Sequence, residues 1–236
     1  MKEASEDYAV IVGVGPGLGA ALARRARREG LHVVLAARNA EPLQPLASEL
    51  GGRAWRCDAT READVDGLFA EISGARGAPR LVIYNAGAFV PRSIVETTAS
   101  EFENCWRIGC LGGFLVGRAA ARLMTAAGHG TILFTGATAS LRGGANFANL
   151  AVGKFGLRAL AQSMARELGP KGVHVAHIII DGMIEAEHRP GRKRAEHAPD
   201  ALLHPDAIAE AYWQLHRQPR SAWTLELDLR PWTEKF

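Results

Sequence analysis

The sequence has few cysteines, no long apolar run and no excess of charge of one sign. The three cysteines, Cys57, Cys105 and Cys110, are an odd number without metal-ligand spacing, which favours a reducing cytoplasm over a disulfide framework. No apolar stretch reaches the ~20 residues of a membrane-spanning helix, so no membrane partner is expected. Residues 1–10 carry acids and lack a signal-peptide core.

The charged residues are well mixed and carry a formal net charge of +3. A balance this small, without basic residues interleaved with aromatic ones, does not favour a nucleic-acid partner. The chain has 236 residues, and 47% of them are hydrophobic, which is enough for one sizeable core. We therefore expect residues 1–236 to form a single domain.

A dense run of glycines follows directly after a short apolar stretch. Residues 9–12 (AVIV) are typical of a buried parallel strand. Gly13, Gly15, Gly17 and Gly19 follow, and from Leu18 onward apolar residues recur with helical spacing. Glycines allow a tight turn and the close approach of a phosphate, and the helix N-terminus offers that phosphate free N–H groups. This context predicts a dinucleotide-binding unit rather than an ordinary glycine loop.

Residues 31–37 are predicted to be the second strand, which ends at Arg38. In dinucleotide-binding folds the tip of this strand meets the adenosine ribose, where a carboxylate binds the 2′-hydroxyl of NAD and an arginine accommodates the 2′-phosphate of NADP. Ala36 and Ala37 supply no carboxylate. The sequence therefore favours NADP, although Arg38 as a solvated loop residue is the alternative.

Strand-like and helix-like segments alternate along the rest of the chain. Further strands are expected at 53–57, 81–84, 131–135, 173–180 and 225–229. Helices are expected at 40–50, 62–73, 100–124 and 205–217, with a further long helix that follows the loop 136–149 and ends near residue 168. The fold class is therefore α/β, a Rossmann-type doubly wound parallel sheet flanked by helices on both faces. Gly109, Gly112 and Gly113 interrupt the helix 100–124 and suggest close packing or a bend.

On these features the chain resembles the short-chain dehydrogenase/reductase family over nearly its whole length. The motifs are the glycines at 13, 17 and 19, the sequence Asn85-Ala86-Gly87 after the fourth strand, and Lys154 at the start of a long apolar helix. The resemblance implies a nicotinamide cofactor, a small-molecule substrate, and a homodimer or homotetramer built on two long helices. It implies cofactor contacts by the following residues: Gly13, Gly15, Gly17, Leu18, Gly19, Arg38, Asp58, Ala59, Asn85, Ala86, Gly87, Lys154 and Gly182.

The family's chemistry uses a tyrosine four residues before the lysine as proton donor, a serine that orients the substrate oxygen, and an asparagine that supports a water relay. At the matching positions this chain has Leu150, Ala137 and Gly109, so that only Lys154 remains. Hydride transfer to a carbonyl builds an alkoxide, which needs a proton donor within reach. The sequence thus predicts a divergent branch of the family with a degenerate active site.

The sequence after the sixth strand also departs from the family. Asp181-Gly182 replaces the usual Pro-Gly, and Ala186 stands where a threonine would contact the carboxamide. Residues 183–204 occupy the place of the family's substrate lid. Their basic residues, such as Arg192, fit either an acidic substrate or a solvated run of charges.

Three residues are candidates for the missing chemistry. Asp181 lies at the carboxyl end of a strand and can act as an acid there, although a role in capping a turn or pairing with Lys154 is the alternative. The ammonium of Lys154 can polarise a substrate oxygen, or it can only hold the ribose. Thr138 and Ser140 lie close to the vacant serine position. His174 and His177 are three apart on a strand, so they face opposite sides, and we expect no metal site.

These inferences predict a cytoplasmic NADP(H)-dependent oxidoreductase that acts on a carbonyl or an alcohol. The candidate catalytic residues are Lys154, Asp181 and Thr138. Two alternatives remain open, namely an inactive nucleotide-binding or regulatory partner subunit and a non-redox enzyme on the same fold.

Overall fold

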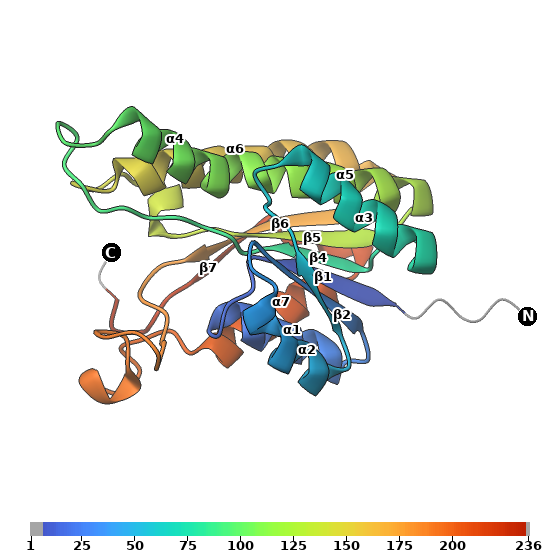
Figure 1. Cartoon of the computed structure of the whole chain (residues 1–236), viewed down its shortest axis with the longest axis horizontal. Coiled ribbons are helices and arrows are strands. Elements are labelled where there is room, and N and C mark those ends of the chain that lie inside the picture. Colours follow the sequence, from blue (N-terminus) through green and yellow to red (C-terminus); the bar gives the residue numbers. More distant parts are fainter. Residues whose placement is uncertain (1–6, 235–236) are drawn as a thin grey trace, which may run out of the picture.

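The computed structural model of the chain describes residues 7–234, which form one domain around a seven-stranded parallel sheet (Figure 1). The strands lie in the order β3-β2-β1-β4-β5-β6-β7. Their bounds are β1 (Tyr8–Val12), β2 (His32–Ala37), β3 (Arg53–Arg56), β4 (Leu81–Tyr84), β5 (Gly130–Thr135), β6 (Val173–Ile180) and β7 (Glu226–Leu229). The predicted α/β fold with a parallel sheet is confirmed.

Helices cover both faces of this sheet (Figure 1). One face carries α1 (Leu18–Arg28), α2 (Gln44–Leu50) and α7 (Pro205–His216). The other face carries α3 (Glu62–Arg76), α4 (Ala99–Trp106), α5 (Gly112–Ala127) and α6 (Ala148–Leu168). The apolar side chains of the strands are buried on both faces, which explains why the central strands read as continuous apolar runs.

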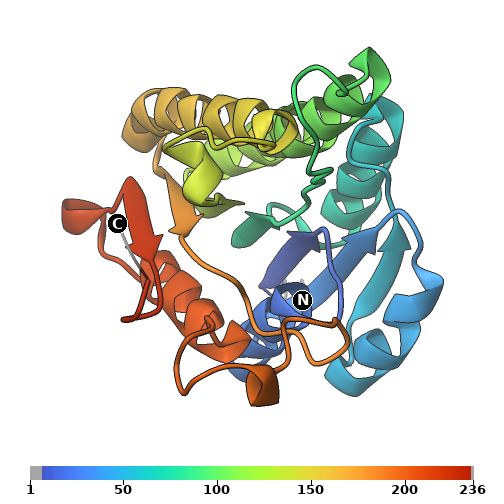
Figure 2. The same ribbon diagram turned by 90° about the vertical axis from the view of Figure 1, so that its left-hand side faces the viewer.

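The order of the strands reverses between β1 and β4. Val12 at the end of β1 pairs with Ala36 of β2 on one side and with Tyr84 of β4 on the other. In an open α/β sheet such a reversal leaves a crevice at the carboxyl ends of the strands. Figure 2 looks onto this edge, where the segment 183–204 (orange) lies beside the turn that joins β1 to α1.

The predicted helix 100–124 is two α-helices joined by a π-helical turn, η2 (Arg107–Leu111). Its glycines are explained by close packing. A Cβ on Gly112 would lie 2.3 Å from the hydroxyl oxygen of Tyr84, and a Cβ on Gly109 would lie 3.3 Å from the Cα of Gly153 on α6. Tyr84 is fully buried beneath this turn and donates a hydrogen bond to the carbonyl oxygen of Ile108.

Other segments differ from the predicted bounds only at their ends. The predicted helix 40–50 begins with a 3₁₀ turn, η1 (Glu41–Leu43), which is compatible with its early prolines. The predicted loop 136–149 contains a second 3₁₀ turn, η3 (Thr138–Ser140). Helix ends fray, and differences of one or two residues carry no functional meaning.

Candidate active site

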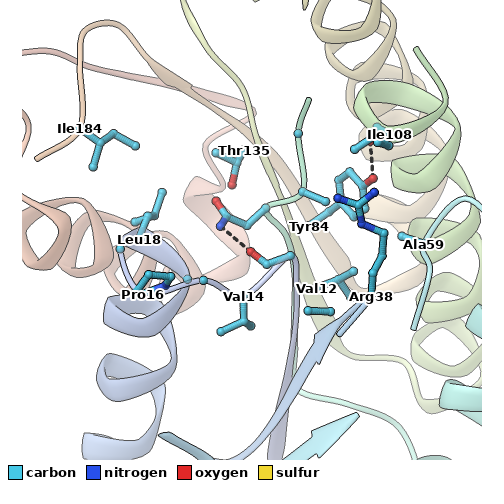
Figure 3. Close-up of a pocket in the computed structure, with 18 of the residues that line it drawn as sticks. Val12, Val14, Pro16, Leu18, Arg38, Ala59, Tyr84, Ile108, Thr135 and Ile184 are labelled. Carbon is cyan, nitrogen blue, oxygen red and sulfur yellow. Dashed lines mark hydrogen bonds between the residues drawn. The ribbon is translucent and has the colours of Figure 1, made fainter. Parts of the chain in front are cut away.

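The glycine turn between β1 and α1 is held against the end of β4. Gly13 has a φ of +89°, and a Cβ there would lie 2.4 Å from the backbone nitrogen of Ala86. The amide of Asn85 donates a hydrogen bond of 3.1 Å to the carbonyl oxygen of Gly13 (Figure 3). A Cβ on Gly19 would lie 2.8 Å from the Cα of Val14. The turn therefore requires glycine for its backbone conformation and for helix packing.

The other two glycines of the turn leave open space at the start of α1. A Cβ on Gly15 or Gly17 would meet no atom within 4 Å. Gly17 caps the helix without a side-chain hydrogen bond, and the first turn of α1 contains no acidic residue. The first N–H groups and the positive end of the helix dipole therefore face an uncrowded space, which suits a pyrophosphate.

The crevice at this edge is a cleft of about 520 Å³, the size of a small-molecule or cofactor site. Its walls come from the glycine turn, from the ends of β2, β3, β4 and β5, and from residues 184–192. Predicted cofactor residues in these walls are Gly13, Gly15, Gly17, Leu18, Gly19, Arg38, Asp58, Ala59, Asn85, Ala86 and Gly87. Lys154 and Gly182, which were also predicted, are not wall residues of this cleft.

Arg38 and Asp58 lie just beyond the ends of the neighbouring strands β2 and β3. Arg38 is exposed at the tip of β2 (Figure 3). Asp58 accepts hydrogen bonds of 2.9 Å and 2.8 Å from the backbone nitrogen and the hydroxyl of Thr60. Burial alone would raise the pKa of Asp58, but these hydrogen bonds and the nearby guanidinium groups of Arg38 and Arg61 lower it. The site therefore presents an ionised Asp58 beside the arginine.

Lys154 is buried on the first turns of α6. Its Nζ donates a hydrogen bond of 2.6 Å to the backbone oxygen of Thr135, a wall residue of the cleft. A Cβ on Gly87, another wall residue, would lie 3.8 Å from Nζ. The ammonium thus lies just behind the cleft wall, where burial lowers the pKa of Lys154 to about 8.

Asp181 and Thr138 are brought together behind the same edge. The hydroxyl of Thr138 donates a hydrogen bond of 2.5 Å to Asp181, whose other oxygen lies 3.3 Å from the guanidinium of Arg230. The alternative of an Asp181–Lys154 ion pair was wrong, because the partner is Arg230 and Lys154 bonds to Thr135. Arg230 follows β7, and nothing in the sequence around it marked it as a site residue.

Ser140, which is close in sequence to the position expected for the family's serine, belongs to a buried network. It is fully buried, its Oγ accepts a hydrogen bond from the backbone nitrogen of Ala137, and it lies 3.3 Å from Nε2 of His177. Nδ1 of His177 lies 3.3 Å from Glu226, which accepts two hydrogen bonds from Arg158. Burial lowers the pKa of His177. This buried network connects the loop after β5 to β6 and β7.

Leu150 is half-buried and lies one helical turn before Lys154 on α6. All three tyrosines of the chain are buried. Tyr8 bonds to the carbonyl oxygen of Gly77, Tyr84 to that of Ile108, and Tyr212 lies 2.8 Å from the hydroxyl of Thr135.

Several wall residues were not predicted as ligand contacts. They are Tyr84, Thr135, Ile184 and Glu185 among others. Tyr84 and Thr135 end strands β4 and β5, so their position at the carboxyl edge was a usable signal. Glu185 belongs to the expected lid, whose fold could not be inferred from its polar composition.

Residues 7–234 contain no group of three or more histidine, cysteine or acidic side chains placed to hold a metal ion. Within the same residues, no helix combines the length and apolar character that crossing a membrane requires.

The comparisons with known proteins identify the family. A family described as short chain dehydrogenase matches residues 7–197. The chain is 31% identical over 219 residues to the uncharacterized oxidoreductase YuxG of Bacillus subtilis, an alignment that covers 89% of this chain and 32% of YuxG.

Two solved structures extend the likeness over the whole fold. A short-chain dehydrogenase from Rhodopseudomonas palustris is 44% identical, with a TM-score of 0.81 and coverage of 96% of this chain and 99% of that one. A metagenomic short-chain oxidoreductase in complex with NADP is 26% identical, with a TM-score of 0.82 and coverage of 96% and 98%. These matches, together with the glycine turn and the strand order, show that the chain belongs to the short-chain dehydrogenase/reductase family of oxidoreductases.

Proposed function

We propose that this protein is an NADP(H)-dependent oxidoreductase that acts on a carbonyl or alcohol, with the ammonium of Lys154 as the proton-donating group. The observation that carries the proposal is the position of Lys154. Its Nζ is buried beside the cleft wall at Thr135 and Gly87, and its pKa of about 8 is close to neutral pH. A general acid works best when its pKa is near the working pH.

The described residues fit a nicotinamide dinucleotide. Gly15 and Gly17 leave room for the pyrophosphate at the uncapped N-terminus of α1, and Gly13 allows the backbone of the turn to approach closely. Arg38 at the tip of β2 supports NADP over NAD, because its guanidinium can pair with a 2′-phosphate. The NADP complex of the related metagenomic enzyme is consistent with this choice.

A nicotinamide cofactor bound in this cleft supplies hydride transfer to or from a carbonyl carbon. In the direction of reduction, Lys154 donates a proton to the substrate oxygen. Thr138 and Asp181 serve as positioning residues, because the carboxylate of Asp181 fixes the Thr138 hydroxyl and is itself held by Arg230.

The replacement of the family's tyrosine by Leu150 bears on the rate. General acid catalysis typically raises the rate of a reaction by ~10²–10⁴-fold. The buried ammonium of Lys154, one helical turn away from Leu150, supplies only part of this increase. We therefore infer a slow reductase with a degenerate active site. We place it in the cytoplasm, in keeping with its free cysteines.

A second candidate function is nucleotide binding without redox chemistry, as a regulatory partner subunit. The observation in its favour is that Lys154, Thr138 and Asp181 do not belong to the walls of the cleft, while the glycine turn is intact. A non-redox reaction in the same pocket is compatible with the same observation.

We further infer a homodimer or homotetramer that buries the outer faces of α5 and α6. Phe114, Val152 and Phe155 are exposed on these two helices, although large apolar side chains usually avoid such positions. Light scattering on the purified protein measures the mass directly, and a monomer at all concentrations would contradict this inference.

The test of the proposed function is a titration with NADPH and NADH, followed by nicotinamide fluorescence, and then a screen of ketones and aldehydes under saturating NADPH. Selective NADPH binding with slow substrate-dependent oxidation supports the oxidoreductase. Tight binding without turnover of any substrate supports the regulatory alternative. Failure to bind either nucleotide would refute both.

A further inference from the structure

A second hollow lies at the opposite edge of the sheet, where the strands begin. In Figure 1 this is the side from which the chain enters β1. The hollow has a volume of about 340 Å³ and is lined by the starts of β5 and β6, the C-terminal end of α7 and the 3₁₀ turn η6 (Arg220–Ala222). It shares no wall residue with the cofactor cleft. We call it the basic pocket.

Three arginines from three different segments line the basic pocket, and no acidic residue does. Arg80 precedes β4, Arg217 follows α7, and Arg220 begins η6. Arg80 lies 3.6 Å from the carboxylate of Asp7, and Arg217 interacts electrostatically with Glu210 of α7, whereas Arg220 makes no salt bridge within residues 7–234. The pocket therefore carries more positive charge than its surroundings neutralise, which is the electrostatic condition for an anion site.

The wall groups are fixed by hydrogen bonds to the backbone and to each other. Arg220 donates a hydrogen bond of 2.7 Å to the carbonyl oxygen of Gly128. Nε2 of His174 lies 2.8 Å from the carbonyl oxygen of Thr224, and the ring of His174 stacks on Trp223 with centroids 5.0 Å apart. A site built in this way loses little side-chain freedom when a ligand binds.

The histidines of the basic pocket respond to its charge. Burial, together with Arg80 and His174, lowers the pKa of His216 to about 4, while Asp7 opposes them. Burial, Arg80 and Arg220 lower the pKa of His129, again against Asp7. Both histidines are therefore neutral near pH 7 and add no charge of their own. Arg80 and Arg220 both lower the pKa of His129, so both arginines lie near this side chain.

Buried ring nitrogens of two wall residues complete the argument. Nε1 of Trp213 and Nδ1 of His129 are buried and have no hydrogen-bond partner among the described residues. An indole N–H can only donate, so it needs an acceptor such as an anionic oxygen. Buried polar groups in native structures almost always have a partner, and those that lack one in the protein indicate a ligand or a water.

We propose that the basic pocket binds a phosphate-type dianion, either inorganic phosphate or the phosphate group of a monoester. Guanidinium groups match the oxygens of phosphate in geometry and charge, and they remain charged at every physiological pH. Trp213 and Trp223 provide apolar wall area beside the arginines, which suits the organic part of a phosphate monoester.

The test follows the indole N–H resonances by heteronuclear NMR while inorganic phosphate is added at constant ionic strength. The chain has five tryptophans, and two of them, Trp213 and Trp223, line the basic pocket. We expect saturable shifts of these two resonances and none for Trp106 or Trp232. The assignment uses Trp213→Phe. This readout is local, so phosphate bound at the N-terminus of α1 does not imitate it.

The test variant carries Arg217→Gln together with Arg220→Gln. The control variant carries Arg28→Gln together with Arg166→Gln. Both pairs remove two positive charges, but Arg28 and Arg166 are exposed away from the basic pocket. Each lost arginine contact should weaken phosphate binding about tenfold, and the control pair should leave it unchanged. If the loss of the Arg220 contact to Gly128 impairs folding, the single variant Arg217→Gln replaces the double variant in the titration.

Parallel titrations with phenyl phosphate and with sulfate identify the source of the anion. Tighter binding of phenyl phosphate than of inorganic phosphate assigns the site to a monoester, and equal or weaker binding assigns it to free phosphate. Shifts that match those caused by sodium chloride, or shifts that persist in the Arg217/Arg220 variant, would overturn the proposal. The outcome does not depend on whether the cofactor cleft binds NADPH.

Discussion

The ammonium of Lys154 donates a hydrogen bond of 2.6 Å to the backbone oxygen of Thr135. The hydroxyl of Thr135 lies in turn 2.8 Å from that of Tyr212 on α7, so the end of β5 is joined to helices on both faces of the sheet. A buried ammonium has little water to solvate it, and its charge is therefore a cost to folding. This relationship ties the proposed proton donor to the stability of the protein.

The first prediction concerns stability against pH. The pKa of Lys154 falls from its ordinary 10.5 to about 8 in the folded protein. Between about pH 8 and pH 10.5 the unfolded chain binds more protons than the folded one. The contribution of Lys154 to the free energy of unfolding therefore rises with pH. Relative to Lys154→Met, the wild type should gain on the order of 3 kcal/mol between pH 7 and pH 10.5. Urea denaturation at both pH values measures the change.

The control for this comparison is Lys171→Met, because Lys171 is exposed and pairs only with the exposed Glu167. That substitution should leave the pH dependence of stability close to that of the wild type. A parallel response of wild type and Lys154→Met across this pH range would show that Lys154 keeps an ordinary pKa.

The second prediction concerns cofactor choice. Arg38→Ala should weaken NADPH binding by roughly tenfold or more, because the 2′-phosphate loses a charge-assisted hydrogen bond. NADH, which lacks this phosphate, should bind almost as before. Fluorescence titration with both nucleotides gives the two affinities, with Arg28→Ala as a control for net charge. Equal losses for NADPH and NADH would remove the reason for preferring NADP.

The third prediction concerns the missing proton donor. Leu150→Tyr together with Ala137→Ser places a phenol one helical turn before Lys154 and a hydroxyl on the loop after β5. Reductase activity on small carbonyls should rise, within the ~10²–10⁴-fold that general acid catalysis typically contributes. The measurement is NADPH oxidation at saturating cofactor. No gain in a folded, NADPH-binding variant would argue against a simple loss of the family's usual site.

The fourth prediction concerns the packing of Tyr84 beneath the π-helical turn. Gly112→Ala should destabilise the protein by about 1–3 kcal/mol, because the new Cβ would lie 2.3 Å from the Tyr84 hydroxyl oxygen. Tyr84→Phe alone should cost about 1 kcal/mol through the lost hydrogen bond to Ile108. In the double variant the clash is relieved, so the two costs should not add.

The matched glycine for this experiment is Gly67 on α3, where a Cβ would meet no atom within 4 Å. Gly67→Ala should stabilise the protein by up to about 1 kcal/mol, because alanine is the better helix former. Thermal unfolding of all four variants gives the free energies. Additive effects of Gly112→Ala and Tyr84→Phe would mean that the two side chains are not in steric conflict.

Much of the cofactor cleft could be predicted from the sequence because it is built from local motifs. A strand, a glycine turn and a helix follow one another from Tyr8 to Arg28, and their spacing fixes both the turn and the exposed helix N-terminus. Arg38 and Asn85 follow predicted strands, and all parallel strands end at the same edge. Their meeting in one cleft therefore follows from strand order alone.

The environment of the catalytic candidates was decided by contacts between distant segments. Asp181 is paired with Arg230, Ser140 with His177, and Thr135 with both Lys154 and Tyr212. None of these pairs has a sequence signal, because side-chain partners that lie far apart in the chain depend on how the elements pack. The sequence by itself determined the fold class and the glycine cradle, through hydrophobic periodicity and backbone sterics. Only the tertiary structure decided which polar groups are buried, what they bond to, and hence that Lys154 carries a lowered pKa.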